Sequence, residues 1–239
     1  MKNSTESPPP TDHPPGGVRA DGTGGLAGPQ PRPLRPPSGK LIERAFFERD
    51  TLEVARQLCG KLLVREVDGE VLYGRLVEVE AYLGPDDLAA HSSGGRRTPR
   101  TEVMFGPPGH AYVYLIYGQY HCLNFVTRPQ GVPQAILIRA LEPGPGVGRC
   151  SGPGLVCIAL KIDRGLNAAP LQPPHLYVLD DGWEPPAIAQ TPRIGVEYSG
   201  QPWAEQPWRF CVPGPYLSRR LPAAKKPGPD RLQQRSRST

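Results

Sequence analysis

Residues 74–87 read GRLVEVEAYLGPDD and place polar side chains at every second position of an otherwise apolar run. Strict alternation is typical of a β-strand, so the pattern predicts that Glu78, Glu80 and Tyr82 project from one face of a sheet. Two carboxylates on one strand face repel each other, and a half-buried carboxylate is costly or takes up a proton. The stretch therefore indicates either a solvated sheet face or a strand that carries a functional site.

Regular patterns continue on both sides of this strand. Upstream, a capping signal at Asp50 and a stop at Gly60 delimit a helix, and a strand follows at 61–67. Downstream, residues 84–110 form a long polar loop of the kind that usually serves a site. Further strands are expected within 111–127 (a hairpin with an aromatic tip), 133–143, 175–181, 193–198 and 208–214, and a short helix within 144–162. The mixture predicts an α+β fold, a single compact domain with a mixed, mainly antiparallel curved sheet, flanking helices and a protruding β-hairpin.

The two ends of the chain differ in composition from its middle. Residues 1–40 contain ten prolines and seven glycines without a sustained apolar pattern, and residues 221–239 are rich in charge and poor in apolar side chains. Such segments cannot bury enough surface to offset the entropy of ordering their backbone. We therefore predict disordered tails at 1–40 and 221–239 around one domain at 41–220.

The net charge of +5 belongs to these tails, which carry +2 and +4 and leave the predicted domain near −1. A pI of about 9.0 therefore identifies no nucleic-acid site by itself. No apolar segment approaches the roughly 20 residues that span a bilayer, and the N-terminus lacks the apolar stretch of a secretory signal. We expect an intracellular protein without membrane contact. The five cysteines are odd in number and form no C-x-x-C pair, which argues against a disulfide framework and a zinc ribbon.

Several chemistry-bearing side chains accompany the opening stretch. A carboxylate and a tyrosine share one strand face, His91 follows in the polar loop, tyrosines occupy the hairpin, and Arg139 lies in another strand. Each has an ordinary alternative, because strand tyrosines usually pack, Arg139 can simply pair with Glu142, and a loop histidine can serve as a hydrogen-bonding group. Together they indicate a site.

Four segments carry a resemblance to a known family. They read VEVEAYLGPDDLAAHSSGGRRTPRTEVMFGPPGHAYVYLIYG at 77–118, CLN at 122–124, LIRALEP at 137–143 and CSGPG at 150–154. In this order and spacing they resemble the alkyladenine DNA glycosylase family, the mammalian type of methylpurine or 3-methyladenine DNA glycosylases, from about Leu52 to Val212. The resemblance implies a monofunctional hydrolase of base excision repair that needs no cofactor or metal. It also implies a monomer that acts on double-stranded DNA containing damaged purines, in the cytoplasm or nucleoid of a bacterium or the nucleus of a eukaryote.

The resemblance gives the second carboxylate of the opening stretch a role. Glu80 matches the family's catalytic general base, which activates a water for attack on C1′ of the deoxyribose and stabilises the oxocarbenium character of the transition state. Arg139 and the main-chain carbonyl of Ile194 match groups around that water, and a carboxylate beside Arg139 is expected to stay ionised at neutral pH. Glu78 has no role in the resemblance, and we expect it to tolerate replacement by Gln.

The resemblance also implies a pocket for a base that is rotated out of the duplex. Tyr82 and His91 would lie on one side of the base and Tyr114 on the other. Tyr117, at the hairpin tip, would fill the gap left in the base stack, and Asn124 would crowd the 2-amino group of guanine. The implied substrates are alkylated or deaminated purines, namely 3-methyladenine, 7-methylguanine, hypoxanthine and ethenoadenine.

The chain departs from the family at several positions that contact DNA. Residues 144–149 (GPGVGR) replace a basic helical insert. Leu155 and Ile158 stand at a usual lysine and glutamine, and Gln119 stands at a usual methionine. The catalytic and pocket positions are intact, so we expect DNA affinity to differ more than chemistry.

The densest basic cluster of the predicted domain is GGRRTPR at 94–100. We interpret Arg96, Arg97 and Arg100 as contacts to the DNA backbone, with a solvated loop as the alternative. Among rival classes, a zinc deaminase is weak because its H-x-E and P-C-x-x-C ligands are missing. A catalytically weak or inactive lesion-binding protein of the same fold stays open, because it would use the same pocket.

The positive charge of the tails yields a prediction. Deleting residues 1–40 and 221–239 should weaken binding to undamaged DNA, because the net charge of these two segments together is more positive than the net charge of the whole chain. Each phosphate that is no longer neutralised should lower the salt slope of log affinity by roughly 0.9, while the single-turnover rate at saturating protein stays unchanged. Titrating both forms with one duplex at several salt concentrations measures the slopes. Parallel slopes would show that the tails do not touch DNA.

Overall fold

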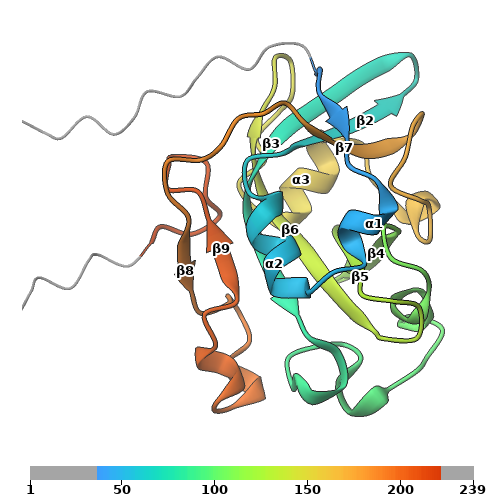
Figure 1. Cartoon of the computed structure of the whole chain (residues 1–239), viewed down its shortest axis with the longest axis vertical. Coiled ribbons are helices and arrows are strands. Elements are labelled where there is room, and N and C mark those ends of the chain that lie inside the picture. The colour runs from blue at the N-terminus through green and yellow to red at the C-terminus, as the bar shows by residue number, and fades with distance from the viewer. Residues whose placement is uncertain (1–36, 222–239) are drawn as a thin grey trace, which may run out of the picture. The chain divides into compact units, whose positions relative to one another are not determined.

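One antiparallel sheet forms around the strand that contains the two carboxylates (Figure 1). The computed structural model describes residues 37–221, so the predicted tails lie outside the described residues except at their inner ends. The first strand begins at Lys40, which lies within the predicted N-terminal tail. A truncated protein that keeps this strand should therefore begin at residue 37, the first described residue. The strands are β1 Lys40–Leu41, β2 Leu62–Val67, β3 Glu70–Tyr82, β4 Ala111–Ile116, β5 Tyr120–Thr127, β6 Gln134–Pro143, β7 Leu176–Asp180, β8 Ala189–Thr191 and β9 Arg209–Cys211.

The strand order within the described part is β1-β7-β2-β3-β6-β5-β4, and β9 pairs with both β3 and β8. Every paired set of strands there is antiparallel. Three helices pack with the sheet: α1 Arg44–Phe47, α2 Thr51–Leu58 and α3 Pro153–Ala159. The predicted α+β fold with a mainly antiparallel sheet is confirmed.

Helix α2 forms where its capping signal predicts. The Asp50 side chain accepts hydrogen bonds from the main-chain N–H groups of Leu52 at 2.9 Å and Glu53 at 3.2 Å, which satisfies two donors of the first turn. The helix ends before Gly60, whose φ of +96° is a backbone conformation that glycine adopts without strain. Its buried face, with Val54 and Leu58, belongs to the main core. The helix therefore covers one side of the sheet near the carboxylate strand.

Strand β3 is the central strand of the sheet, and its residues 73–81 are buried on both faces. It pairs with β2 along its first half, with β6 along most of its length and with β9 beside Glu78–Glu80. Glu78 and Glu80 have no solvent exposure. The alternative of a solvated sheet face is therefore excluded, and both carboxylates must find partners inside the protein.

The register between β3 and β6 contains two compensating irregularities at the carboxylates. Leu76 pairs with Leu141 and Glu78 with Ala140, which leaves Val77 as an extra residue on β3. The next pair skips a residue of the other strand, so Arg139 is extra on β6. Bulges of this kind re-aim side chains and are common next to active sites. Here they bring Arg139 opposite the stretch that carries both carboxylates.

The predicted hairpin is β4–β5, and its tip holds an unusual residue. Tyr117 and Gly118 have φ values of +53° and +68°, which match the two central residues of a type I′ turn. Positive φ is unfavourable for an aromatic residue, and the Tyr117 side chain is 87% exposed. The tip therefore projects a large apolar side chain at a cost in backbone strain.

The strand predicted within 193–198 is wrong. This segment is irregular and ends in the 3₁₀ turn Glu197–Ser199, and the strand lies upstream as β8. Pro192 separates the two and has no N–H for a ladder hydrogen bond, so pairing with β9 stops at Thr191. All five cysteines are free and buried in the structure. None of the helices in residues 37–221 has the length and apolar character needed to cross a membrane.

Candidate active site

A cavity of about 240 Å³ opens between strands β3, β4, β5 and β6 and the 193–198 segment. Seven of the residues predicted for the site line it, and these are Tyr82, His91, Tyr114, Tyr117, Asn124, Arg139 and Ile194. Glu80 is not part of the lining but lies directly behind it, since it bonds to Tyr82, Arg139 and Ile194. The fold thus brings the predicted catalytic and base-binding residues together.

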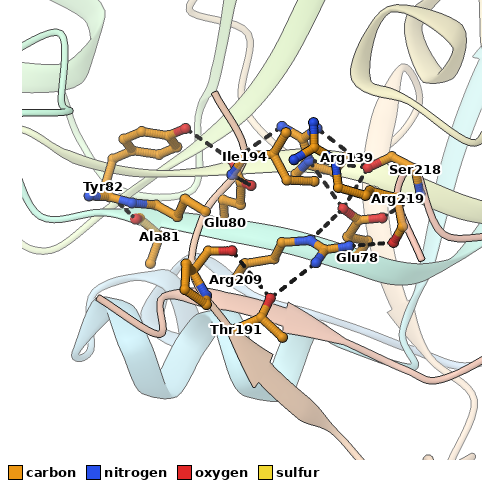
Figure 2. A network of polar contacts seen from close by, with 12 residues as sticks. Glu78, Glu80, Ala81, Tyr82, Arg139, Thr191, Ile194, Arg209, Ser218 and Arg219 are labelled. Carbon is orange, nitrogen blue, oxygen red and sulfur yellow. Dashed lines mark hydrogen bonds and ion pairs between the residues drawn. The ribbon is translucent and has the colours of Figure 1, made fainter. Parts of the chain in front are cut away.

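Glu80 is held by three donors (Figure 2). Its Oε1 accepts the main-chain N–H of Ile194 at 2.8 Å, and its Oε2 accepts the hydroxyl of Tyr82 at 3.0 Å and Nη1 of Arg139 at 3.2 Å. Burial raises the pKa of Glu80 above its ordinary value, and the nearby Arg139 charge and the Ile194 hydrogen bond oppose this only in part. A raised pKa makes the ionised carboxylate a stronger base.

Glu78 sits in a different environment although it shares the same arginine. It accepts Nε of Arg139 at 3.1 Å and Nε of Arg209 at 2.8 Å. The main-chain N–H and the hydroxyl of Ser218 each donate to it at 2.6 Å. Burial alone would raise the pKa of Glu78, but the hydrogen bonds from Arg209 and Ser218 outweigh burial and hold the pKa below its ordinary value. Glu78 is therefore an ionised anchor.

Arg139 is buried and connects the two carboxylates (Figure 2). Its ion pairs go to Glu78 and Glu80, so the simple alternative of a pair with Glu142 is excluded. The expectation that Glu78 would tolerate Gln also changes, because a buried carboxylate that neutralises two arginines cannot lose its charge without leaving them unpaired. Sequence reasoning missed this role because Arg209 and Ser218 lie more than 130 positions away along the chain.

Aromatic side chains form the walls of the cavity. The rings of His91 and Tyr114 meet edge to face with centroids 4.7 Å apart, and Tyr114 lies 5.4 Å from Tyr112. His91 Nδ1 is 3.0 Å from the hydroxyl of Tyr112, a residue that the sequence did not single out. Burial and the nearby charge of Arg100 lower the pKa of His91 to about 4, so its ring is neutral at neutral pH. Asn124 is fixed by its amide, which donates to the carbonyl of Tyr112 at 3.0 Å.

A buried ion pair that the sequence did not reveal supports the segment before Ile194. Arg193 is fully buried and pairs with both oxygens of Asp87. It also donates to the carbonyl of Ala81 at 3.0 Å, and its guanidinium lies 4.7 Å from the ring centroid of Tyr82. Arg193 therefore fixes both the Ile194 main chain and the ring of Tyr82. No local pattern links Arg193 to Asp87, which is 106 positions away.

The predicted basic cluster divides into three different environments. Arg96 is exposed. Arg97 pairs with Glu102 at 2.6 Å and lies over Phe105, so its charge is matched locally. Arg100 instead lies over the ring of Tyr114 at 4.7 Å, with Nη2 3.4 Å from Nε2 of His91. The interpretation as one DNA-backbone patch therefore stays a prediction that fits Arg96 best.

Side chains at the three substituted positions that depart from the family are at least partly exposed. Ile158 of α3 is 61% exposed, and Gln119 follows the hairpin tip as an exposed residue. Leu155 is half-buried in α3. Throughout residues 37–221, no cluster of three or more His, Cys, Asp or Glu side chains offers a metal-binding set.

The structure thus combines a cavity walled by aromatic rings with a buried carboxylate of raised pKa directly behind it, a combination that is common at binding and catalytic sites. Known proteins identify its family: a model described as methylpurine-DNA glycosylase matches residues 45–215. The chain therefore belongs to the methylpurine-DNA glycosylase family. This membership makes it a hydrolytic DNA glycosylase of base excision repair and confirms the resemblance seen in the sequence.

Individual relatives agree over nearly their whole length. A protein of Desulfitobacterium hafniense (strain Y51) is 44% identical over 194 residues, covering 72% of this chain and 95% of the relative. A Bacillus cytotoxicus protein is 47% identical over 205 residues, covering 73% and 97%. A Bacillus cereus (strain G9842) protein is 48% identical over 207 residues, covering 74% and 98%. Each bears the name 3-methyladenine DNA glycosylase, assigned provisionally.

The opposite pKa directions of the two carboxylates predict opposite effects on stability. The pKa of Glu78 lies below its ordinary 4.5, so its stabilisation is complete above that pH and is lost as the pH falls through the folded-state pKa. Glu78→Gln should lower the free energy of unfolding at pH 7 by about 3 kcal/mol and should remove that acid-side loss. Urea unfolding at pH 7 and at pH 4 measures both effects.

Glu80→Gln is the matched control for this experiment. The pKa of Glu80 is raised, so its contribution favours folding at low pH and is lost as the pH rises through the folded-state pKa. Replacing the ionised group by Gln should therefore leave the free energy of unfolding at pH 7 close to that of the parent or above it. Equal decreases in the free energy of unfolding of the two variants would contradict the assignment of a structural role to Glu78 and a reactive role to Glu80.

Proposed function

We propose that the protein rotates alkylated or deaminated purines out of duplex DNA and hydrolyses their N-glycosidic bond with a water activated by Glu80. The substrates would be 3-methyladenine, 7-methylguanine, hypoxanthine and ethenoadenine. The observation that supports this most is the position of Glu80, a buried carboxylate of raised pKa directly behind a cavity walled by aromatic rings. The acting unit would be the domain at 41–220, a monomer without cofactor that works on DNA inside the cell.

The proposed chemical step is a hydrolytic displacement. Water attacks C1′ of the deoxyribose, the bond from C1′ to the base nitrogen breaks, and its electron pair leaves with the base. Glu80 takes the proton from the water, and Oε1 has acceptor capacity for it because it holds a single hydrogen bond, from Ile194. The negative charge of Glu80 stabilises the oxocarbenium character of the sugar. Arg139 fixes the carboxylate and keeps enough positive charge beside it to favour ionisation.

The cavity walls would bind the flipped base by stacking. Tyr82 and Tyr114 both line the cavity, and His91 packs edge to face against Tyr114 instead of standing opposite it as the resemblance implied. Stacking on aromatic rings contributes on the order of 1–3 kcal/mol per base and tolerates varied ring chemistry, which suits a broad range of lesions. The neutral His91 ring is held in the wall by Arg100, which donates to Nε2, and by the Tyr112 hydroxyl at Nδ1, so it would contact the base through its ring rather than by a hydrogen bond. Asn124 lines the same cavity and would exclude the 2-amino group of guanine.

Entry of the base requires that the duplex stack be opened. Tyr117 is positioned for this at the hairpin tip, where it is both highly exposed and part of the cavity lining. An aromatic wedge inserted into the gap offsets part of the unstacking cost. The exposed Arg96 would anchor the backbone nearby.

One observation favours a second candidate, a lesion-binding protein with weak or no turnover. Glu80 is fully buried and already holds three hydrogen bonds, so a water must reach it through a crowded site. Both candidates predict specific binding to a lesion duplex. Base release separates them.

Glu80→Gln should abolish base release and keep lesion binding, because it removes the proton acceptor and preserves the shape of the side chain. Single-turnover excision on duplexes that hold each of the four lesions measures release, and equilibrium titration of the same duplexes measures binding. The parent provides the control. A variant rate within a few-fold of the parent rate would remove Glu80 from the mechanism, and a parent that binds but never releases the base would support the second candidate.

Tyr117→Asn should separate stability from lesion recognition. Asn adopts positive φ more readily than an aromatic residue and suits a type I′ turn before glycine, so the free energy of unfolding should rise by up to about 1 kcal/mol. Affinity for a lesion duplex should fall, because no ring then fills the stack. Denaturation and lesion titration are compared with Tyr120→Asn, a change at the neighbouring exposed tyrosine. Undiminished lesion affinity would leave Tyr117 without a role in flipping.

A further inference from the structure

Among the described charged side chains that contact residues lining the cavity, one has no opposite charge within ion-pair distance. Arg193 is paired with Asp87. Arg139 and Arg209 face the two carboxylates Glu78 and Glu80, so that cluster is also neutral overall. Arg100 touches the cavity aromatics but has no carboxylate within ion-pair distance among residues 37–221. The immediate surroundings of the cavity therefore carry one excess positive charge.

Arg100 reaches the cavity from behind one of its walls. It lies in a neighbouring groove together with Arg164, and Tyr114 lines both this groove and the cavity. The guanidinium is 4.7 Å from the ring centroid of Tyr114. A base stacked on the other face of that ring would lie about 3.5 Å from it, which puts its charge on the order of 8 Å from the guanidinium. Two like charges at that distance repel, and because Arg100 is exposed the repulsion is partly screened by solvent.

His91 already responds to this field. Its Nε2 is 3.4 Å from Nη2 of Arg100, and its ring packs against Tyr114 inside the cavity. Burial and the Arg100 charge both lower the pKa of His91, so a protonated, positively charged ring is unfavourable in this part of the cavity. A base that carries a formal positive charge would meet the same resistance.

We propose that Arg100 is a specificity-determining residue, whose unpaired guanidinium behind Tyr114 disfavours positively charged bases in the cavity relative to neutral ones. The inference rests on the proposed function and refines its substrate class. Purines alkylated on a ring nitrogen within DNA, such as 7-methylguanine, carry a positive charge, whereas hypoxanthine and ethenoadenine are neutral. Binding of the flipped base is therefore biased towards the neutral lesions, while cationic lesions still react because their glycosidic bonds are weak.

The test compares the binding of two lesions, one cationic and one neutral, placed in the same DNA sequence. Duplexes that differ only in 7-methylguanine or ethenoadenine are titrated with full-length protein under single-turnover conditions, and the half-saturating protein concentration is compared for the two lesions. Arg100→Gln should shift the ratio in favour of 7-methylguanine by about three- to tenfold, the range expected for one partly screened charge. Arg100→Lys keeps the charge and should leave the ratio close to that of the parent. Arg97→Gln is the matched control, since Arg97 is paired with Glu102 and stacks outside the cavity.

The ratio also distinguishes this role from simple binding of a DNA phosphate by Arg100. An arginine that only binds a phosphate holds both duplexes alike, so its replacement by Gln would weaken both by the same factor. An unchanged ratio with weaker binding overall would therefore overturn the proposal. Failure of the parent to release either base would instead overturn the proposed function.

A measurement without DNA tests the field of Arg100 independently of activity. NMR titration of the His91 ring should show that Arg100→Gln raises the pKa of His91 from about 4 towards its ordinary value, whereas Arg97→Gln leaves it in place. A His91 pKa that does not move in Arg100→Gln would show that the guanidinium exerts no field in the cavity and would overturn the proposal.

Discussion

The burial of Glu78 and Glu80 around one shared arginine is the constraint on which the rest of the structure depends. Neither carboxylate has any solvent exposure, and Arg139 donates to both. A charge buried without a partner destabilises a protein by several kcal/mol, so each must meet a counter-charge with good geometry. The compensating bulges of β3 and β6, the placement of β9 with Arg209, and the return of Ser218 all meet this requirement. Strands β6 and β9 and the segment around Ser218, which are distant along the chain, are thereby all bonded to Glu78.

The same cluster explains why a strand carries two carboxylates side by side. Glu78 faces two guanidinium groups and two donors from Ser218, which favour its ionised form. Glu80 shares only Arg139 and is otherwise held by neutral donors, so burial dominates and its pKa rises. Pairs of groups whose environments push their pKa values apart commonly divide the structural and reactive roles between them. Glu78 fixes the arginine, and the fixed arginine holds Glu80 in place behind the cavity.

Features that depend on neighbouring residues were predictable from the sequence, and features that depend on distant partners were not. The α2 cap at Asp50, the stop at Gly60 and the turn at Tyr117-Gly118 are local, so composition and spacing reveal them. The segment at 193–198 has the apolar alternation of a strand, yet Arg193 is drawn to Asp87 and the main chain of Ile194 to Glu80. These tertiary bonds override the local preference.

The site residues divide in the same way. Residue types and their places along the chain indicated a site that includes Tyr82, His91, the hairpin tyrosines and Arg139, and the family resemblance added Asn124, Ile194 and the expected role of each residue. The partners that tune them come from elsewhere in the chain: Arg193 behind Tyr82, Arg209 beside Glu78, and Arg100 behind Tyr114. A charge acts through space and leaves no periodic signal, so the electrostatic character of the cavity becomes visible only once the fold is known. All three of these partners are arginines, and each contacts a site residue without itself lining the cavity.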